Sequence, residues 1–241
     1  MQVDLSQPLV TPPAPPPVEA PFETKLLIPG ALAEAAAAWI EARIPRDPHA
    51  VGPEGTYTVG SLYFDTPHLE IYRRAHAASV AKYRIRRYGA EERLFLECKE
   101  KLSGRVVKRR SPIAPSDLSA LAELATHDGW PATWFAAAVR ERDLRPVCRV
   151  SYVRRAWIGE LDGQRVRVTL DRDLRAGPAA GLELPGMLDG GRLLFRGCVL
   201  EIKHAGGLPP SVQEWLAELG CSPQPLSKYR TAVEVCGVAA A

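Results

Sequence analysis

Cysteine is scarce in this sequence, and its placement suggests neither a cross-link nor a metal site. The five cysteines are odd in number and scattered, and none forms a CxxC pair or a cluster with histidine. The five histidines are isolated as well. This pattern excludes a disulfide framework and a structural zinc site, and it is typical of reduced thiols. We therefore expect a cytoplasmic protein.

Long apolar runs are absent too. No stretch approaches the roughly 18 apolar residues that a membrane span needs, so none is predicted. The N-terminus has no basic region followed by an apolar core, so we expect no secretory signal. It is rich in proline instead. This predicts a disordered tail over residues 1–21, followed by one folded domain over residues 22–236.

The motifs of several common enzyme classes are also missing. No Walker loop, GxGxxG fingerprint or GxSxG elbow occurs in the chain. The net charge is only +3, so the molecule as a whole is not strongly basic. Any basic character that matters for binding must therefore be local.

What the sequence does contain is a set of strand-like segments with charge at every second residue. They cover residues 80–88, 93–101, 165–171 and 199–204. Because successive strand side chains point to opposite faces, each segment has one apolar and one charged face. A single charged face is usually solvated, but several faces rich in Arg and Lys indicate a surface that holds a polyanion. If the sheet curls into a barrel, the charged face lines its lumen.

The remaining elements complete a prediction of the fold. Strands are predicted at 22–28, 56–65, 79–88, 93–101, 105–113, 147–158, 165–171 and 193–204. Helices are predicted at 30–43, 116–127, 131–143 and 211–220, with a short helical turn near 68–75. Ser211 and Glu214 have capping-box spacing at the start of the last helix, and residues 172–192 are predicted to be a loop. The expected class is α+β, an antiparallel β-barrel tunnel with helices packed outside.

The charged faces suit a particular kind of ligand. A triphosphate or polyphosphate needs several cations that converge on it, and Arg and Lys supply forked donors and compact charges respectively. Phosphoryl transfer needs positioning, charge neutralisation and usually a divalent metal held by a carboxylate. Arg/Lys faces with a few glutamates in step provide these groups.

Short motifs occur in an order that resembles a known family. They are SLYFDT (61–66), KYRIRRY (82–88), FLECKEK (95–101), VVKRR (106–110), RVSYVRRA (149–156), RVTLD (167–171), VLEIKH (199–204) and LSKY (226–229). Together they resemble the catalytic domain of the vacuolar transporter chaperone (VTC) complex, the polyphosphate polymerase of the triphosphate tunnel metalloenzyme superfamily. The resemblance implies a tunnel-shaped barrel, a nucleoside triphosphate or polyphosphate as substrate, and Mn or Mg as cofactor.

The resemblance and the charged faces also imply roles for single residues. Those expected to neutralise phosphate charge during catalysis are Lys25, Arg84, Arg86, Lys99, Lys108, Arg154 and Lys228. Those expected to bind substrate are Tyr152, Ser227, Arg167 and Lys203. Glu201 is expected to hold the metal, and Glu97 is interpreted as a salt-bridge partner of the cations.

The chain departs from the superfamily at the first strand. Hydrolytic members often carry ExExK there, and in this chain Pro21 stands where the first carboxylate would be. This favours a phosphotransferase over a simple triphosphatase. The SPX regulatory domain and the membrane helices that accompany the eukaryotic polymerase are not in this sequence, so their functions are not carried over, and a membrane partner stays possible.

Three functions remain open from the sequence. The first is a polyphosphate polymerase that moves the terminal phosphoryl group of a nucleoside triphosphate to polyphosphate. The second is a tunnel triphosphatase, in which water replaces that acceptor. The third is a polyphosphate-binding module without catalysis. Nucleic-acid binding is disfavoured, because stacking aromatics do not alternate with the cations.

Overall fold

A computed structural model describes residues 22–50, 52, 55–75, 81–102, 105–124, 129–184 and 186–238. The proline-rich segment 1–21, which the sequence predicts to be disordered, lies outside these residues. None of the helices in the described ranges combines the length and apolarity that crossing a bilayer requires.

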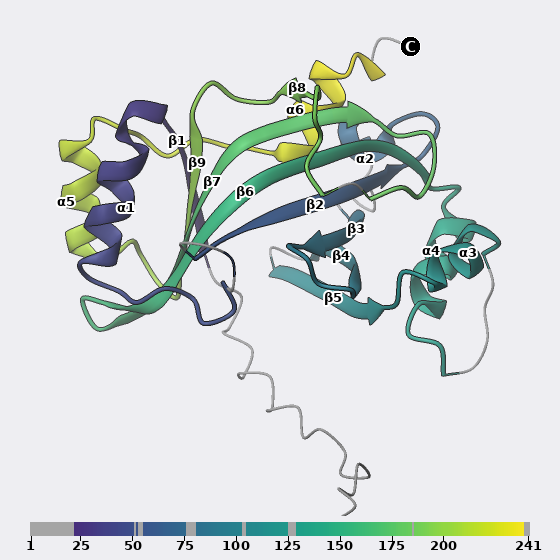
Figure 1. Ribbon diagram of the computed structural model, residues 1–241, viewed down its shortest axis with the longest axis horizontal. Helices are drawn as coiled ribbons and strands as arrows, with labels where there is room; N and C mark the ends of the chain where they lie inside the picture. The colour runs from purple at the N-terminus through teal and green to yellow at the C-terminus, as the bar shows by residue number, and fades with distance from the viewer. Residues whose placement is uncertain are drawn as a thin grey trace, which may run out of the picture.

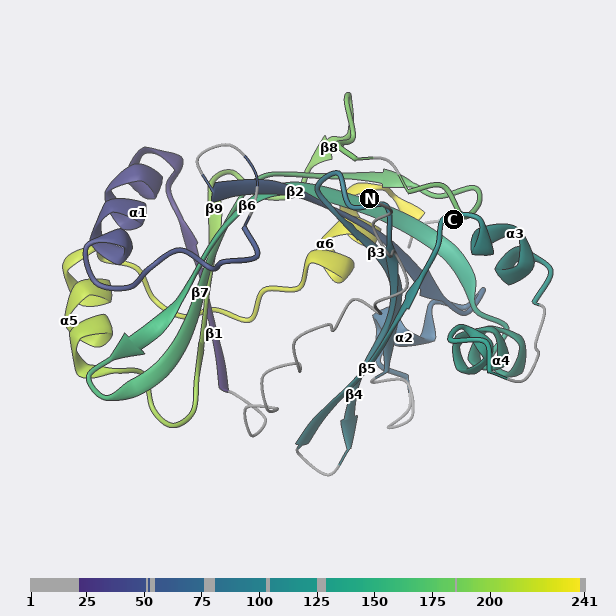
Figure 2. The same cartoon turned by 60° about the horizontal axis from the view of Figure 1, so that its bottom comes forward.

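One strongly curved antiparallel sheet forms the centre of the molecule (Figures 1 and 2). Its strands follow the order β1 (Phe22–Ile28), β9 (Cys198–His204), β7 (Gln164–Pro178), β6 (Arg145–Leu161), β2 (Thr56–Asp65), β3 (Lys82–Tyr88), β4 (Leu94–Leu102) and β5 (Arg105–Ile113), with the short β8 (Arg192–Leu193) paired to β7. β1 and β5 are the two edges, and no backbone pairing joins them within the described residues. The sheet is therefore tunnel-like but open along one side.

Helices cover the outer, apolar face of the sheet in two groups (Figure 1). α1 (Ala33–Glu41) follows a 3₁₀ turn (Gly30–Leu32) and packs with α5 (Pro210–Glu218) over one half of the sheet. The rings of Trp39 and Trp215 stack there, with centroids 4.3 Å apart. α3 (Asp117–Ala122) and α4 (Thr133–Glu141) cover the other half. The expected α+β class with outer helices is confirmed.

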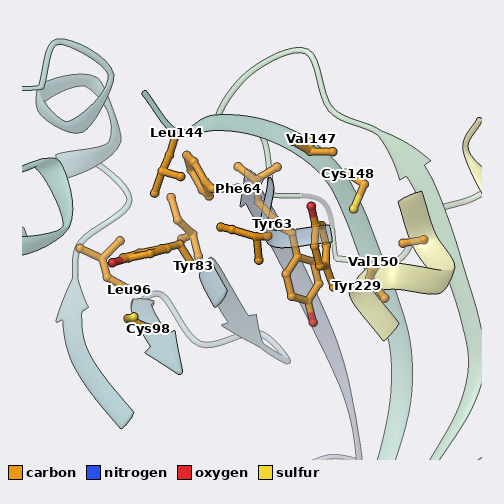
Figure 3. Packing of buried hydrophobic residues seen from close by; sticks show 14 of the residues in the cluster. Tyr63, Phe64, Tyr83, Leu96, Cys98, Leu144, Val147, Cys148, Val150 and Tyr229 are labelled. Carbon is orange, nitrogen blue, oxygen red and sulfur yellow. The ribbon is translucent and has the colours of Figure 1, made fainter. Parts of the chain in front are cut away.

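Side-chain alternation explains why the helices lie outside. On β4, Leu96 and Cys98 point into the apolar cluster with Phe64 and Tyr83 (Figure 3). Their neighbours Glu97 and Lys99 therefore point to the opposite, concave face. The alternation seen in the sequence thus separates a core from a charged interior.

One short helix was predicted and another was missed. The expected helical turn after β2 is α2 (Glu70–Arg73). α6 (Lys228–Val235) was not predicted, because Lys228 was expected to lie beyond the last helix. Ser227 caps α6 by accepting a hydrogen bond from the backbone N–H of Arg230 at 3.4 Å.

Two further predictions about local structure are wrong. Residues 172–192 are not all loop, because β7 continues to Pro178 past an irregularity where Asp173 has a φ of +53°. A β-bulge at this point lets the strand continue through the charged residues that suggested a loop. The capping box at Ser211 does not form, since α5 starts one residue earlier with Pro209 as N-cap, and the backbone N–H of Ser211 donates to Asp162 instead.

Candidate active site

The concave face of the sheet lines a cavity of about 3290 Å³. All the candidate residues predicted from the sequence lie on its wall, and they come from both halves of the sheet and from the start of α6: Lys25, Arg84, Arg86, Lys99, Lys108, Tyr152, Arg154, Arg167, Glu201, Lys203, Ser227 and Lys228. The structure therefore brings together side chains that are about two hundred positions apart in the sequence. Their chemical roles remain predictions.

A first cluster of cations surrounds Glu97, which is 1% exposed. Its carboxylate lies 2.6 Å from Arg84 Nη2, 2.9 Å from Lys108 Nζ and 3.4 Å from Arg110 Nε. Arg86 approaches to 3.9 Å. Burial alone would raise the pKa of Glu97, but these cations outweigh it and hold that pKa far below its ordinary value. Glu97 is thus a salt-bridge partner, as interpreted from the sequence.

A second cluster centres on Asp171, which is fully buried. Arg154 donates two hydrogen bonds to its carboxylate, at 2.6 and 2.8 Å, and Lys228 Nζ lies 2.8 Å away. Burial opposes ionisation of Asp171, yet Arg154 and Lys228 keep its pKa below the ordinary value. The geometry of this pair is the bidentate fork that makes Arg–carboxylate bonds strong. Asp171 therefore holds two predicted phosphate-binding cations in place.

A third cluster joins β1, β9 and β4. Lys25 Nζ lies 2.6 Å from Glu23 and 4.0 Å from Glu201, and Lys99 Nζ lies 2.9 Å from Glu23. Lys203 Nζ is 3.7 Å from Glu201. The register places Lys25 opposite Glu201 and Glu23 opposite Lys203, so both carboxylates share the cavity face.

Glu201 fits a divalent cation better than the other carboxylates of these clusters do. Glu97 and Asp171 are filled by close cations, and Glu23 is contacted by lysines at 2.6 and 2.9 Å. The nearest cations of Glu201, in contrast, are beyond hydrogen-bond distance. Burial would raise the pKa of Glu201, but Lys203, Lys228 and Lys25 keep it well below the ordinary value, so the side chain is ionised.

The donor count points to one type of metal binding. The described residues contain no group of three or more His, Cys, Asp or Glu side chains that could form a complete cage. Mg²⁺ commonly binds to one or two carboxylates together with substrate phosphates and water. Glu201, as a single available carboxylate, matches this arrangement.

The other predicted substrate-binding residues occupy different parts of the wall. Arg167 is held by Asp47, whose carboxylate lies 3.0 Å from Arg167 Nη2. Ser227 accepts a hydrogen bond from Lys82 Nζ at 3.2 Å. The hydroxyl of Tyr152 is buried and has no hydrogen-bond partner among the described residues, so its hydrogen-bonding capacity is unused.

Reasoning from the sequence missed several residues that line the cavity or hold its cations: Glu23, Asp47, Lys82, Arg110 and Asp171. For most of them a signal was present. Glu23, Lys82 and Asp171 are in step with predicted residues on their strands, and Arg110 closes the VVKRR motif. Asp47 follows a helix and precedes no periodic segment, so the sequence carries no comparable signal for it.

Comparison with known proteins agrees with this geometry. Two solved structures share the fold. A "putative adenylate cyclase" from Bacillus halodurans is 13% identical, with a TM-score of 0.51 over 87% of this chain and 94% of that one. A "putative adenylyl cyclase" from Hippeastrum, described as having a dominant triphosphatase activity, is 16% identical, with a TM-score of 0.51 over 90% and 96%. Identities this low bear on the fold alone.

Sequence comparison gives the family. No curated protein matches the chain. The VTC domain, in contrast, matches residues 21–236, which is nearly all of the folded part. The ordered motifs, the fold and this match agree, and the chain belongs to the VTC domain family.

Proposed function

We propose that this protein is a metal-dependent phosphotransferase that moves the terminal phosphoryl group of a nucleoside triphosphate to a polyphosphate chain. Membership of the VTC domain family supports a reaction on triphosphate-type substrates. The observation that carries the proposal is the excess of cations on one cavity wall. Around Glu97 alone, several cations share a single carboxylate, which leaves positive charge for a bound anion.

The arrangement suits phosphoryl transfer because that reaction needs positioning and charge neutralisation more than covalent help. Arg84 and Arg86 on β3 and Arg154 on β6 line the wall with Lys228 on α6. The pKa of both Arg86 and Arg154 is held well above the ordinary value, against the effect of burial, by nearby tyrosines and carboxylates. These side chains therefore stay charged and would contact phosphate oxygens from different sides.

Glu201 would hold the divalent cation. Bound there, Mg²⁺ or Mn²⁺ would neutralise charge on the phosphate oxygens. Tyr152 would donate its hydroxyl to a phosphate oxygen, and Ser227 would do the same from the start of α6. Lys25 and Lys203 flank Glu201 and would contact the same phosphates.

A tunnel triphosphatase is the second candidate, because it would use the same residues with water as acceptor. The Hippeastrum protein described with triphosphatase activity shares the fold. Against it stands Pro21 in place of the first carboxylate of ExExK. A binding module without catalysis is disfavoured, since anion binding alone gains nothing from the carboxylate of Glu201 among the cations.

The deciding experiment is incubation of the purified protein with ATP and Mg²⁺ or Mn²⁺, with polyphosphate resolved on gels and free phosphate measured in the same tube. We expect long chains and ADP. Arg84→Ala and Glu201→Gln should each lower turnover by about 100-fold or more, the scale of losing one group that stabilises transition-state charge. The matched control is Glu41→Gln, which alters an exposed ion pair with Arg46; neither residue lines the cavity.

Each result separates the candidates. Release of orthophosphate without polyphosphate chains would show that the protein is a hydrolase and not a polymerase. If polyphosphate binds tightly both with and without a metal chelator, and neither polyphosphate chains nor orthophosphate form, the protein is a binding module. Turnover that survives both cavity substitutions would refute the site itself.

A further inference from the structure

The SLYFDT segment has no role in the proposed chemistry, although it pairs with the strand that carries Arg84 and Arg86. It forms the end of β2, and its alternate residues Ser61, Tyr63 and Asp65 are 3%, 4% and 0% exposed. Buried polar side chains in this number need partners. Their partners reveal what the segment does.

Two of the three hold the cavity arginines. Ser61 and Tyr63 lie directly opposite Arg86 and Arg84 in the β2–β3 register. Arg86 Nε donates to Ser61 Oγ at 3.1 Å, and Arg84 Nη1 donates to the Tyr63 hydroxyl at 3.3 Å. Arg84 is thus fixed on one side by β2 and on the other by Glu97, while Arg86 is fixed by β2 and only approaches Glu97.

The third residue, Asp65, holds a helix. Its carboxylate accepts from the backbone N–H groups of Thr66, Ile71 and Tyr72 at 2.7, 2.9 and 2.9 Å, which ties α2 to β2. The hydroxyl of Tyr229, on the first turn of α6, donates to the same carboxylate. A charged acceptor makes these bonds stronger than bonds between neutral groups.

The Tyr229 ring completes the attachment. It is 2% exposed and lies against Tyr63, with ring centroids 5.3 Å apart (Figure 3). Tyr229 is the neighbour of Lys228, the only cation of the predicted set that reaches the cavity from a helix among the described residues. The position of Lys228 Nζ, 2.8 Å from Asp171, therefore depends on how α6 docks.

We propose that Ser61, Tyr63 and Asp65 form a positioning strand, in which Asp65 acts through the Tyr229 hydroxyl to hold Lys228 in the cavity. This rests on the proposed function, because it assigns Lys228 to the binding of phosphate. Tyr229 and Asp65 are positioning residues, since they are 2% and 0% exposed and act through Lys228. The bond from Tyr229 to Asp65 links SLYFDT to LSKY through residues 164 positions apart.

The test measures binding of inorganic triphosphate to the full chain by calorimetry, in a double-mutant cycle. Tyr229→Phe keeps the ring against Tyr63 and removes only the hydroxyl. We expect it to weaken binding about tenfold, the scale of losing one hydrogen bond to a charged group. In a Lys228→Met background the same change should alter affinity by less than about twofold, because the cation that it positions is gone.

A merely structural role would give a different pattern. If Tyr229 only stabilised the fold, Tyr229→Phe would lower the melting temperature without weakening triphosphate binding well below that temperature. Equal losses of affinity in both backgrounds would also overturn the inference. Tyr72→Phe is the matched control, because it removes a hydroxyl that makes only an exposed hydrogen bond to Glu234 of α6 at 3.4 Å. The bond of Tyr72 to Asp65 comes from the backbone N–H and is retained. It should leave affinity unchanged.

The wild-type protein separates this inference from the proposed function. If the wild type does not bind triphosphate, both the proposed function and the positioning role are refuted. If the wild type binds and Tyr229→Phe binds equally well, only the positioning strand is refuted.

Discussion

A single carboxylate, Glu97, balances several cations at the centre of the cavity, and its burial makes that balance sensitive to substitution. Glu97→Gln keeps the shape and removes the charge. Breaking a buried ion pair typically destabilises by about 3–5 kcal/mol. Lys108 and Arg110 remain 47% and 40% exposed, and water can solvate them, so the effect should be smaller.

We therefore expect Glu97→Gln to reduce the free energy of unfolding by about 2–3 kcal/mol, or roughly 4–12 °C in melting temperature. Triphosphate should restore part of the loss, because an anion can replace the missing charge. Thermal melts with and without triphosphate test both parts. Glu41→Gln, at an exposed pair, should cost less than about 1 kcal/mol. Equal melting shifts for the two variants would contradict the account.

Lys82 provides a prediction about pH. Burial lowers its pKa from 10.5 to about 8, with Lys25 and Lys99 contributing, although Tyr63 opposes the shift. The unfolded chain thus binds more protons than the folded chain between about 8 and 10.5, so this group destabilises the fold at lower pH and the penalty disappears as pH rises. A bound polyanion favours the charged form.

Triphosphate binding at pH 8 should therefore be coupled to proton uptake by Lys82 of about half a proton. Tyr88, whose pKa is lowered to about 8 by Arg86, Arg84 and Arg110 against the effect of burial, should add to the uptake in the wild type. Calorimetry in two buffers of different ionisation enthalpy measures the total. Lys82→Met should remove its share, and an unchanged uptake would show that Lys82 does not titrate in this range.

Many residues of the candidate site could be predicted one by one, because the alternation of side chains along each strand decides which of them share a face. Lys99 and Glu201 could be placed in this way from the amino-acid sequence alone. What alternation cannot show is which charges meet across the sheet. Asp171 was visible on a charged face, yet its role as the partner of Arg154 and Lys228 depends on the pairing of β6 with β7 and on α6.

At the scale of elements, strand β9 depends on the residue that precedes it. Gly197 has a φ of +137°, and a Cβ there would lie 2.3 Å from the carbonyl oxygen of Ile28 on β1. The following strand carries Glu201 and Lys203 into the cavity. Only glycine allows β9 and β1 to approach this closely with that backbone conformation.

Gly197→Ala should accordingly destabilise the protein by about 1–3 kcal/mol or more, since strain and a backbone clash combine. It should also weaken triphosphate binding through Glu201 and Lys203. Chemical denaturation and calorimetry would measure the two effects. Gly181→Ala is the control, because no atom lies within 4 Å of the added Cβ and the backbone there needs no glycine.

Most elements were predictable because their patterns are local. β2 matches its predicted bounds, and β1 does too. The failures have tertiary causes. The second half of β7 pairs with β6 only after a bulge. In the sequence this stretch contains charged residues and glycines, so it resembles a loop. α6 has eight residues, too few for stable isolated helix formation, so its existence depends on Tyr229 and Ser227.

At the scale of the whole molecule, net charge and binding surface are separate properties. A chain of charge +3 would bind polyanions weakly if its charges were spread evenly. Here the cations are concentrated on one concave wall, where low exposure limits screening by salt. The fold therefore creates a local field that composition does not reveal.

The open side of the sheet concerns how a ligand enters. No backbone hydrogen bonds join β1 to β5 in the described residues, and the ion pair of Glu23 with Lys99 spans the gap between β1 and β4. Lys99 is 42% exposed, so separating this pair costs about 0–1 kcal/mol. A closed barrel would require a linear polymer to thread by its end, whereas an open side, as found in the described part of the chain, would permit lateral entry.

Association kinetics distinguish threading from lateral entry. Polyphosphate with both termini blocked should associate as fast as unmodified polyphosphate in stopped-flow measurements, because no free end is needed. A rate that collapses on blocking the ends would show that the polymer threads. Lateral entry would let the protein engage the middle of a long chain, and polymer length would then cease to limit capture.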